Sequence, residues 1–385
     1  MKKINFTDVN PLSKKEAFLV EKEILSTIKK KDFILGQNVA KFEKIFSNMS
    51  NSKYAIGCAN GTDALILALK SLNLKKNHEV IIPGMSYIST ALCVALNNLK
   101  LIFADVDAHT GLISFESIKK KLSKNTKAII PVNLYGQKVD IKLLRNIVGK
   151  KIFIIEDSAQ SHFASSCKNC RKNNHLLCYK KEKNHKYSDL SCYSFYPAKN
   201  LGAYGDAGVV TTNNINLYKK ISILRNLGTV KKNVHLYEGI NSRLDTLQAS
   251  ILLKKINLTP KYNNYRRIIS NYYDEGLGYI GDIKLTITDP GSSRHLYVIR
   301  TKYRDKLCKF LKNKNIHSQI HYPYSLNKVG ALKEKTKKIT LPISESWAKE
   351  CISLPLHPKI QINEVNYVIK IIKEFFTKNG KYNNI

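Results

Sequence analysis

One lysine of the chain differs from the others in its surroundings. Lys199 lies in the segment SFYPAKNLGAYGDAG (residues 194–208), after an apolar run and before three closely spaced glycines. Glycine-rich backbone can come close to a bound ligand because no Cβ intervenes. A lysine held in such an enclosed place can lose its proton and attack a carbonyl carbon. Lys199 is therefore the candidate nucleophile of the sequence.

The segment NGTDALILAL, which begins at Asn60, could bind a phosphate group. Gly61, Thr62 and Asp63 stand at the start of a run with the spacing of a helix. The first N–H groups of a helix have no partner within it, and together with the helix dipole they attract an anion. The same residue types are also ordinary helix caps, so this segment alone leaves both interpretations open.

Two more segments place a chemically useful side chain after an expected strand. Tyr87 could stack on a planar ligand there, or simply pack against its neighbours. Asp157 ends the apolar run of FIIED, directly after Glu156. A buried carboxylate is costly unless it is paired, and a protonated pyridine nitrogen is one such partner; helix capping is the alternative. A phosphate cradle, an aromatic ring, a buried aspartate and an enclosed lysine together predict a site for pyridoxal 5'-phosphate.

The elements that would position these residues alternate along the first part of the chain. The short β-branched runs expected as strands are HEVIIPG (78–84), KLIFADVD (100–107), KAIIPVNLYG (127–136) and KIFIIEDSA (151–159). Helix-like runs are found between them, for example at 62–72 and 89–99. This alternation predicts an α/β fold with a mostly parallel sheet, helices on both faces, and ligands at the carboxyl ends of the strands.

The pattern changes after about residue 255. A polar helix-like segment at 260–275 is followed by the strand-like RHLYVIRT and ends in an amphipathic helix near 362–377. We therefore predict a large domain at 1–255 and a smaller α+β domain at 256–385.

The composition limits the classes to which the chain can belong. Its 385 residues can bury a sizeable core, and no apolar run is long enough to predict a membrane span. The first residues lack the apolar core of a signal peptide, so the expected location is the cytoplasm, with reduced cysteines. The formal net charge of +35 would suit a nucleic-acid partner, but the lysines are scattered over the whole chain. This scatter favours a lysine-rich surface over a nucleic-acid site.

Motifs along nearly the whole chain resemble the DegT family of sugar-nucleotide aminotransferases, which depend on pyridoxal phosphate. The matching segments are FILGQNVAKFEKIFS, NGTDALILAL, VNLYGQKVDI, IIEDSAQSH, SFYPAKNLGAYGDAG, NSRLDTLQA, HYPYSLN and SLPLHP. The resemblance implies fold type I, the fold of aspartate aminotransferase. It also implies a homodimer whose two active sites are shared between the subunits.

The resemblance assigns a role to each candidate residue. Lys199 would form the Schiff base with the cofactor and later move a proton between the cofactor and the amine-bearing carbon. Asp157 would hold the pyridine nitrogen, Gln160 would lie against the phenolic oxygen, and Tyr87 would stack on the ring. The phosphate would be bound by Gly61, the backbone of Thr62 and Asp63, the hydroxyl of Ser194, and Asn241 and Arg243 of the second subunit. The substrate would be contacted by His162 and His321. Either histidine could instead have no role.

The implied reaction has two halves. L-glutamate gives its amino group to the cofactor, and a keto sugar linked to a nucleoside diphosphate then accepts it, as in amino-sugar biosynthesis for a polysaccharide. The segment around Lys199 resembles members that aminate C3 of a 3-keto-6-deoxy sugar more than members that act at C4, which remains the alternative. A lysine rather than a histidine at this position favours transamination over dehydration.

The chain departs from the family in a cysteine-rich insertion at about 164–186. The spacing C-x2-C-x4-H-x2-C is formed by Cys167, Cys170, His175 and Cys178. Three thiolates and an imidazole suit tetrahedral zinc, and four protein ligands would make it a structural site. The alternative is a polar loop without metal.

Two single residues also depart from the family pattern. Phe163 stands where the family usually has glycine, and Asn327 stands where many members have histidine. An alternative of another class is a zinc-knuckle nucleic-acid-binding protein on an inactive aminotransferase scaffold. The presence of every residue needed for the cofactor favours the enzyme.

Overall fold

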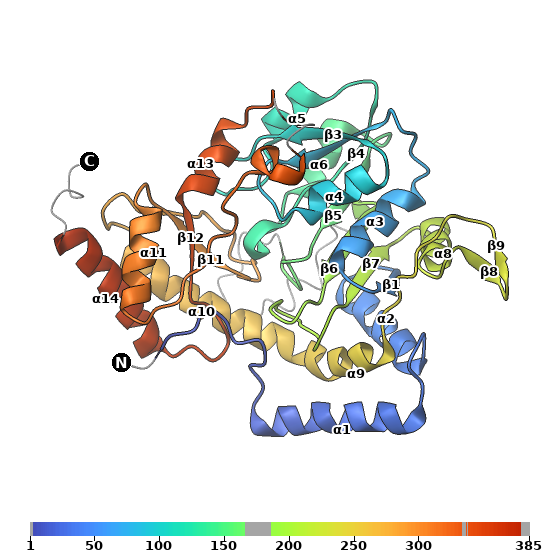
Figure 1. Ribbon diagram of the computed structural model, residues 1–385, viewed down its shortest axis with the longest axis horizontal. Helices are drawn as coiled ribbons and strands as arrows, with labels where there is room; N and C mark the ends of the chain where they lie inside the picture. The colour runs from blue at the N-terminus through green and yellow to red at the C-terminus, as the bar shows by residue number, and fades with distance from the viewer. Residues whose placement is uncertain (1–2, 166–185, 333–335, 337, 379–385) are drawn as a thin grey trace.

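A seven-stranded sheet forms the centre of the large unit of the protein (Figure 1). The computed structural model describes residues 3–165, 186–332, 336 and 338–378. The strand order is β1-β7-β6-β5-β4-β2-β3. The strands are β1 (Tyr54–Cys58), β2 (Glu79–Pro83), β3 (Lys100–Ala104), β4 (Thr126–Ile129), β5 (Phe153–Asp157), β6 (Leu190–Ser194) and β7 (Gly208–Thr212). Neighbours from β3 to β6 are parallel and β7 is antiparallel to both of its neighbours, so the predicted mostly parallel sheet is confirmed.

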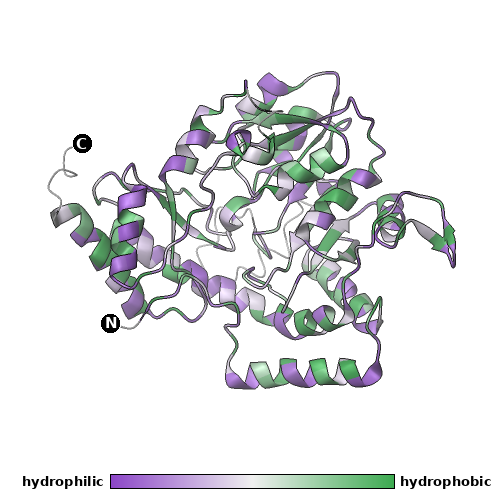
Figure 2. Cartoon of the chain, in the orientation of Figure 1, coloured by the Kyte–Doolittle hydropathy of each residue, from purple (hydrophilic) through white to green (hydrophobic). Residues whose placement is uncertain are grey.

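Helices cover both faces of this sheet. One face carries α3 (Gly61–Ser71), α4 (Ser89–Leu96) and α8 (Ile215–Leu224). The other carries α2 (Gln37–Met49), α5 (Phe115–Lys121), α6 (Ile141–Val148) and α9 (Thr246–Lys255). Ile154 and Ile155 of β5 belong to the cores on opposite faces, as the alternation of side chains along a strand requires. Burial on both faces explains why the central strands are almost continuously apolar, as Figure 2 shows.

The helix α1 (Lys14–Lys30) lies outside these layers, alongside α9 (Figure 1). It begins with a capping box formed by Ser13 and Glu16. Phe18 and Leu25 on this helix are 62% and 59% exposed, although its opposite side packs on the molecule. The helix therefore presents apolar side chains outward.

The C-terminal part has a core of its own. A three-stranded antiparallel sheet joins β10 (Lys284–Leu285), β11 (Tyr297–Arg300) and β12 (Cys351–Leu354). The helices that pack on it are α10 (Thr259–Leu277), α11 (Arg304–Asn313) and α14 (Ile362–Lys378). Ile4 is buried in this second core, so the N-terminal residues join the C-terminal unit in space. The change of core after α9 is consistent with a boundary near residue 255, which stays a prediction.

The remaining elements are short or connect the two units. Trp347 of α13 (Pro342–Glu350) packs against Tyr135 beside the large sheet. The small ribbon and single turns are β8 (Thr229–Lys231), β9 (Val234–His235), η1 (Leu134–Gly136), η3 (Ile256–Leu258), η4 (Leu326–Lys328) and η5 (Gly330–Leu332). Within the described ranges, no helix combines the length and the apolar character that crossing a membrane demands.

The strand expected at 127–136 is shorter in the structure. β4 ends at Ile129, and the chain then turns. Pro131 has no N–H group to donate, and Tyr135 and Gly136 adopt positive φ angles of 60° and 94°. The second half of the predicted strand is therefore a loop at the carboxyl end of the sheet.

Candidate cofactor site

The start of α3 forms a cradle at the carboxyl end of β1. The side-chain oxygen of Asn60 accepts a hydrogen bond of 2.8 Å from the amide of Asp63 and caps the helix. The backbone amides of Gly61 and Thr62, at the first two positions of the helix, have no carbonyl partner within it. They are therefore the amides that can bind an anion. A Cβ on Gly61 would lie 2.5 Å from the Cβ of Ser194, so only glycine allows this approach. Gly61, Thr62 and Ser194 therefore lie together, whereas the amide of Asp63 already has a partner.

Asp157 lies at the same edge of the sheet, at the end of β5. The hydroxyl of Thr90 donates a hydrogen bond of 2.9 Å to its Oδ2, and the amide of Ala159 donates one of 3.2 Å to its Oδ1. Burial raises the pKa of Asp157, while these two hydrogen bonds and the charge of Lys199 act in the opposite direction. The buried carboxylate can therefore accept a further hydrogen bond, for example from a protonated ligand nitrogen.

Lys199 follows β6 in a turn that glycine makes possible. Its amide donates a hydrogen bond of 2.8 Å to the carbonyl of Tyr196. A Cβ on Gly202 would lie 2.3 Å from the carbonyl oxygen of Pro197, which excludes any other residue there. Burial lowers the pKa of Lys199 to about 8, although the charge of Asp157 acts to raise it. Its amine is therefore neutral far more often than that of an exposed lysine, and can act as a nucleophile or a base.

The amide of Gln160 is fixed at both ends. The backbone amide of Tyr135 donates a hydrogen bond of 2.7 Å to its Oε1. Its Nε2 must then point the other way, where it donates one of 2.9 Å to the hydroxyl of Tyr322. An amide nitrogen carries two hydrogens, so the second can serve a ligand oxygen. The hydroxyl of Tyr135 in turn donates to the carbonyl of His321 at 2.5 Å.

Tyr87 stands beside this group of residues, just before α4. It is 57% exposed, and its ring lies 5.8 Å from that of Tyr322, centroid to centroid. An exposed ring at this position is available to stack on a planar ligand, as the sequence predicts.

The two predicted substrate histidines differ in their placement. His321 accepts or donates a hydrogen bond of 2.8 Å with the hydroxyl of Ser353, and burial together with the charge of Lys199 lowers its pKa to about 4. His162 is fully buried between Tyr193 and Phe195, with ring centroids at 5.8 and 5.4 Å. Its burial also lowers its pKa, to about 3. The predicted substrate contact of His162 does not fit a side chain enclosed by aromatic rings.

Asn241 and Arg243 line a cavity close to the chain segment that leads into the cradle. The cavity has a volume of about 320 Å³ and is also lined by Ile34, Ala59 and Asp206. Arg243 donates a hydrogen bond of 3.1 Å to the side chain of Asn226. Neither residue makes a contact with Ser194 or Thr62 of the same chain among the described hydrogen bonds. Their predicted role at the phosphate of a second subunit stays a prediction.

The family departures at Phe163 and Asn327 have structural explanations. Phe163 has a φ of 54°, in the region that favours glycine, and its ring packs 5.9 Å from that of Phe46. The side-chain amide of Asn327 donates hydrogen bonds to the carbonyl of Ile339 and to Glu345, at 2.9 and 2.8 Å. Both side chains are buried and support the fold around the site.

Several residues of the site were not found from the sequence. Thr90 and Tyr135 reach Asp157 and Gln160 from distant parts of the chain. A signal for Thr90 does exist, because two serines and one threonine occur within the five positions of SYIST, shortly after β2. The backbone amide of Tyr135 has no comparable signal, since every residue except proline has a backbone N–H group and the residue type does not reveal its partner.

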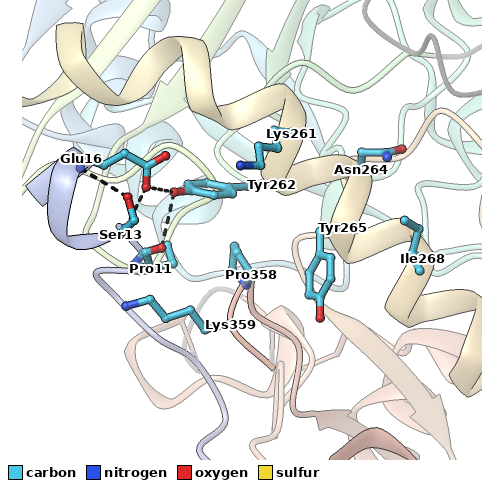
Figure 3. A pocket seen from close by; sticks show the side chains of 10 residues that line it. All are labelled: Pro11, Ser13, Glu16, Lys261, Tyr262, Asn264, Tyr265, Ile268, Pro358 and Lys359. Carbon is cyan, nitrogen blue, oxygen red and sulfur yellow. Dashed lines mark hydrogen bonds between the residues drawn. The ribbon is translucent and has the colours of Figure 1, made fainter. Parts of the chain in front are cut away.

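The predicted zinc ligands lie outside the described residues, so the zinc site stays a prediction. In the parts of the chain that the structure describes, no three His, Cys, Asp or Glu side chains are grouped so as to hold a metal. A separate cavity of about 450 Å³ lies between the N-terminal segment, α10 and the loop after β12 (Figure 3). None of the predicted cofactor residues lines it.

The sequence matches the model of the DegT/DnrJ/EryC1/StrS aminotransferase family over residues 15–373. It is 33% identical to the UDP-2-acetamido-2-deoxy-3-oxo-D-glucuronate aminotransferase of Pseudomonas aeruginosa, over 95% of this chain and 98% of that protein. It is 34% identical to the dTDP-3-amino-3,6-dideoxy-alpha-D-galactopyranose transaminase of Aneurinibacillus thermoaerophilus, over 97% of this chain and 99% of that protein.

Solved structures are similar over almost the whole chain. The crystal structure of DesV from S. venezuelae in complex with a ketimine intermediate superposes with a TM-score of 0.90 at 28% identity, over 98% of this chain and 99% of that one. The structure of NtdA from Bacillus subtilis with bound cofactor PMP superposes with a TM-score of 0.87 at 25% identity, over 98% of this chain and 86% of that one.

Proposed function

The chain belongs to the DegT/DnrJ/EryC1/StrS aminotransferase family, and we propose that it transfers an amino group from L-glutamate to a keto sugar linked to a nucleoside diphosphate. It has fold type I and is a pyridoxal-phosphate-dependent transferase. The observation that carries the proposal is Lys199, a half-buried lysine whose pKa is lowered by burial to about 8, at the same sheet edge as the buried carboxylate of Asp157. Transamination needs an amine of this kind, and a lysine in water would stay almost fully protonated.

The residues present fit pyridoxal 5'-phosphate. The approach of Gly61 to Ser194 leaves no room for a side chain, as expected where backbone must surround a phosphate. Asp157 is 6% exposed and accepts two hydrogen bonds, yet a carboxylate can accept more. A protonated pyridine nitrogen would compensate its burial. The backbone N–H groups at one end of the site would donate to the phosphate, and the carboxylate at the other end would accept from the ring nitrogen, so the two ends match the two polar ends of the cofactor.

The chain's own residues would divide the work as follows. The bound cofactor supplies a ring that withdraws electrons from the carbon bearing the amino group. Lys199 would remove and return the proton at that carbon through its Nζ. Asp157 would keep a proton on the ring nitrogen, and the Nε2 of Gln160 would donate to the phenolic oxygen. His321 and Tyr322 would line the substrate side of the site.

The substrate is proposed from the relatives. The two aminotransferases named above act, by their names, on a 3-oxo sugar and at position 3 of a dideoxy sugar, each linked to a nucleotide. An enzyme named for 3-amino-3,4,6-trideoxy-glucose, from Streptomyces venezuelae, is 31% identical. These names support amination at C3, with C4 as the alternative. We propose L-glutamate as the amino donor because the family pattern implies it.

We also propose that the active enzyme is a homodimer with shared sites. Asn241 and Arg243 would then reach the phosphate bound by the other subunit. Ile34 lines the same cavity and is 49% exposed, and its neighbours Phe33 and Leu35 are 42% and 40% exposed. Exposed apolar residues beside a polar cavity support a surface that a second subunit covers. A cytoplasmic location stays a prediction.

The proposal is tested with purified protein, pyridoxal phosphate and a panel of nucleotide-linked 3-keto and 4-keto sugars. We expect the protein to acquire a visible absorption band on binding the cofactor, and to lose it with L-glutamate while 2-oxoglutarate forms. A 3-keto sugar should then restore the band and yield an amino sugar detectable by mass spectrometry. Lys199→Ala should abolish both steps, whereas Lys76→Ala, at an exposed loop lysine, should not. Cofactor binding without turnover of either sugar class would contradict the proposed substrate.

A further inference from the structure

The turn that begins α4 contacts both ends of the candidate site. Thr90 donates its hydroxyl hydrogen to Asp157 at 2.9 Å, and its oxygen lies 2.7 Å from the hydroxyl of Ser86. Ser89 lies 2.7 Å from the hydroxyl of Thr62, in the phosphate cradle. Three hydroxyl contacts thus involve the five residues 86–90, which also include Tyr87. This segment therefore reaches both the cradle and Asp157 through side-chain hydroxyls.

The direction of the hydrogen bonds at Asp157 follows from their chemistry. An ionised carboxylate only accepts, so the single hydrogen of the Thr90 hydroxyl is used on Asp157. The contact between Ser86 and Thr90 must then be donated by Ser86. Ser86, Thr90 and Asp157 are 3%, 0% and 6% exposed, so water competes little with this chain of donors. The two hydroxyls stabilise the charged form of the carboxylate.

The hydroxyls of Ser86, Ser89 and Thr90 do not cap the start of α4. A serine or threonine near a helix start usually caps it by accepting from a backbone amide. The N-cap position of α4 is Ile88, and no side chain caps the helix. Ser86, Ser89 and Thr90 bond instead to each other and to α3 and β5. Their use across elements indicates that they position the site rather than start the helix.

We propose that residues 86–90 are a positioning element with two ends. At one end, Ser89 positions the phosphate cradle through its contact with Thr62. At the other end, Thr90, which accepts a hydrogen bond from Ser86, positions Asp157 for the ring nitrogen. This inference rests on the cofactor assignment of the proposed function. Tyr87 lies between the two anchored hydroxyl groups in sequence, so the same turn would present its ring to the cofactor. Ser89 and Thr90 act through other residues and are positioning residues.

The two ends can be separated with two non-covalent probes. Pyridoxamine 5'-phosphate forms no covalent bond with Lys199, and pyridoxamine is the same ring without the phosphate. Ser89→Ala should weaken binding of the phosphate form about fivefold, the effect of one lost neutral hydrogen bond, and leave pyridoxamine unchanged. Thr90→Val should weaken both probes equally, by about tenfold or more, because a hydrogen bond to a charged group is lost.

A second readout reports the ring nitrogen directly. With cofactor labelled with nitrogen-15 at the ring, Thr90→Val should move the nitrogen signal toward that of the unprotonated ring. Thr90→Ser keeps the hydroxyl and should restore both the signal and the affinity, and Ser89→Ala should leave the signal unchanged. A merely structural role of Thr90 would not move this signal.

The outcomes distinguish the inference from the proposed function. A wild-type protein that binds neither probe would overturn the cofactor assignment itself. A wild-type protein that binds both, with Ser89→Ala and Thr90→Val folded and equal to it in affinity and nitrogen signal, would overturn the positioning role alone. Equal losses for both probes in Ser89→Ala would also overturn it, because they would show no separate phosphate end. Thermal melting of each variant establishes that it is folded.

Discussion

Replacing Gly61 by alanine tests whether the start of α3 and Ser194 form one cradle. The added Cβ would lie 2.5 Å from the Cβ of Ser194 and 3.2 Å from its Cα and Oγ. Ordinary contact begins at 3.4 Å, so the helix start or Ser194 must move by about 0.9 Å. Both are backbone-anchored at the ends of α3 and β6, and neither is a flexible side-chain tip that could turn away.

The expected cost combines two opposing effects. Forcing an extra methyl group into a packed site costs about 1–3 kcal/mol. Alanine in place of glycine gains up to about 1 kcal/mol in a helix, and less at its first residue. We therefore expect the free energy of unfolding to fall by about 1–2 kcal/mol. The displaced amides of Gly61 and Thr62 should weaken binding of pyridoxamine 5'-phosphate about tenfold or more, because charged hydrogen bonds depend steeply on geometry.

The assay is chemical denaturation together with titration of pyridoxamine 5'-phosphate and pyridoxamine. Gly330→Ala is the matched control, because a Cβ at Gly330 would meet nothing within 4 Å. Only the phosphate form should bind more weakly to Gly61→Ala, and the control should match the wild type in both measurements. Unchanged stability and unchanged affinity for the phosphate form in Gly61→Ala would refute the argument that this approach is tight and functional.

Three further predictions concern Lys199, the dimer and zinc. The rate at which protein freed of cofactor reacts with pyridoxal phosphate should rise about tenfold per pH unit below pH 8 and level off above it, because only the neutral amine of Lys199 attacks; a flat profile in stopped-flow absorbance would contradict the lowered pKa. Mixed dimers of Lys199→Ala and Asn241→Ala chains, refolded together, should regain aminotransferase activity that neither variant has alone, since one of their two sites is complete; no recovery would argue against shared sites. Metal analysis of the purified protein should find about one zinc per chain, lost in Cys170→Ser, and its absence after growth with added zinc would overturn the predicted zinc site.

Much of the fold could be predicted because the signals are local. The central strands are short apolar runs, and burial on both faces makes such runs easy to recognise. The strand predicted at 127–136 is too long because mostly apolar residues continue to Leu134, beyond the end of β4 at Ile129. The turn there depends on the positive φ of Tyr135, which a tyrosine does not announce in a sequence.

The candidate site was predictable only where its residues follow strands in order. Lys199, Asp157 and Gly61 each stand just past an apolar run, and the topology brings these ends to one edge. The hydroxyl of Thr90 meets Asp157 across 67 positions, so the run of hydroxyl residues in SYIST can draw attention to Thr90 but cannot show that Asp157 is its partner. His162 is the converse case. It lies two positions after Gln160 and reads as part of the site, but its side chain turns into the aromatic core.

Lys199 and Asp157 share an electrostatic conflict that the cofactor would resolve. Burial favours the neutral form of both groups, while each charge favours the charged form of the other. In the protein without cofactor, the charge of Asp157 therefore keeps the pKa of Lys199 higher than it would be if burial were the only influence. A cationic ring nitrogen at Asp157 compensates the carboxylate and removes most of that effect, so the amine should become easier to deprotonate once the ring is in place. Thr90 supports the same division of charge, because its hydrogen bond keeps the proton off Asp157 and leaves it for the ring. The buried carboxylate thus explains both why the cofactor should stabilise the fold on binding and why the amine of Lys199 should be more reactive in the assembled site than in the protein alone.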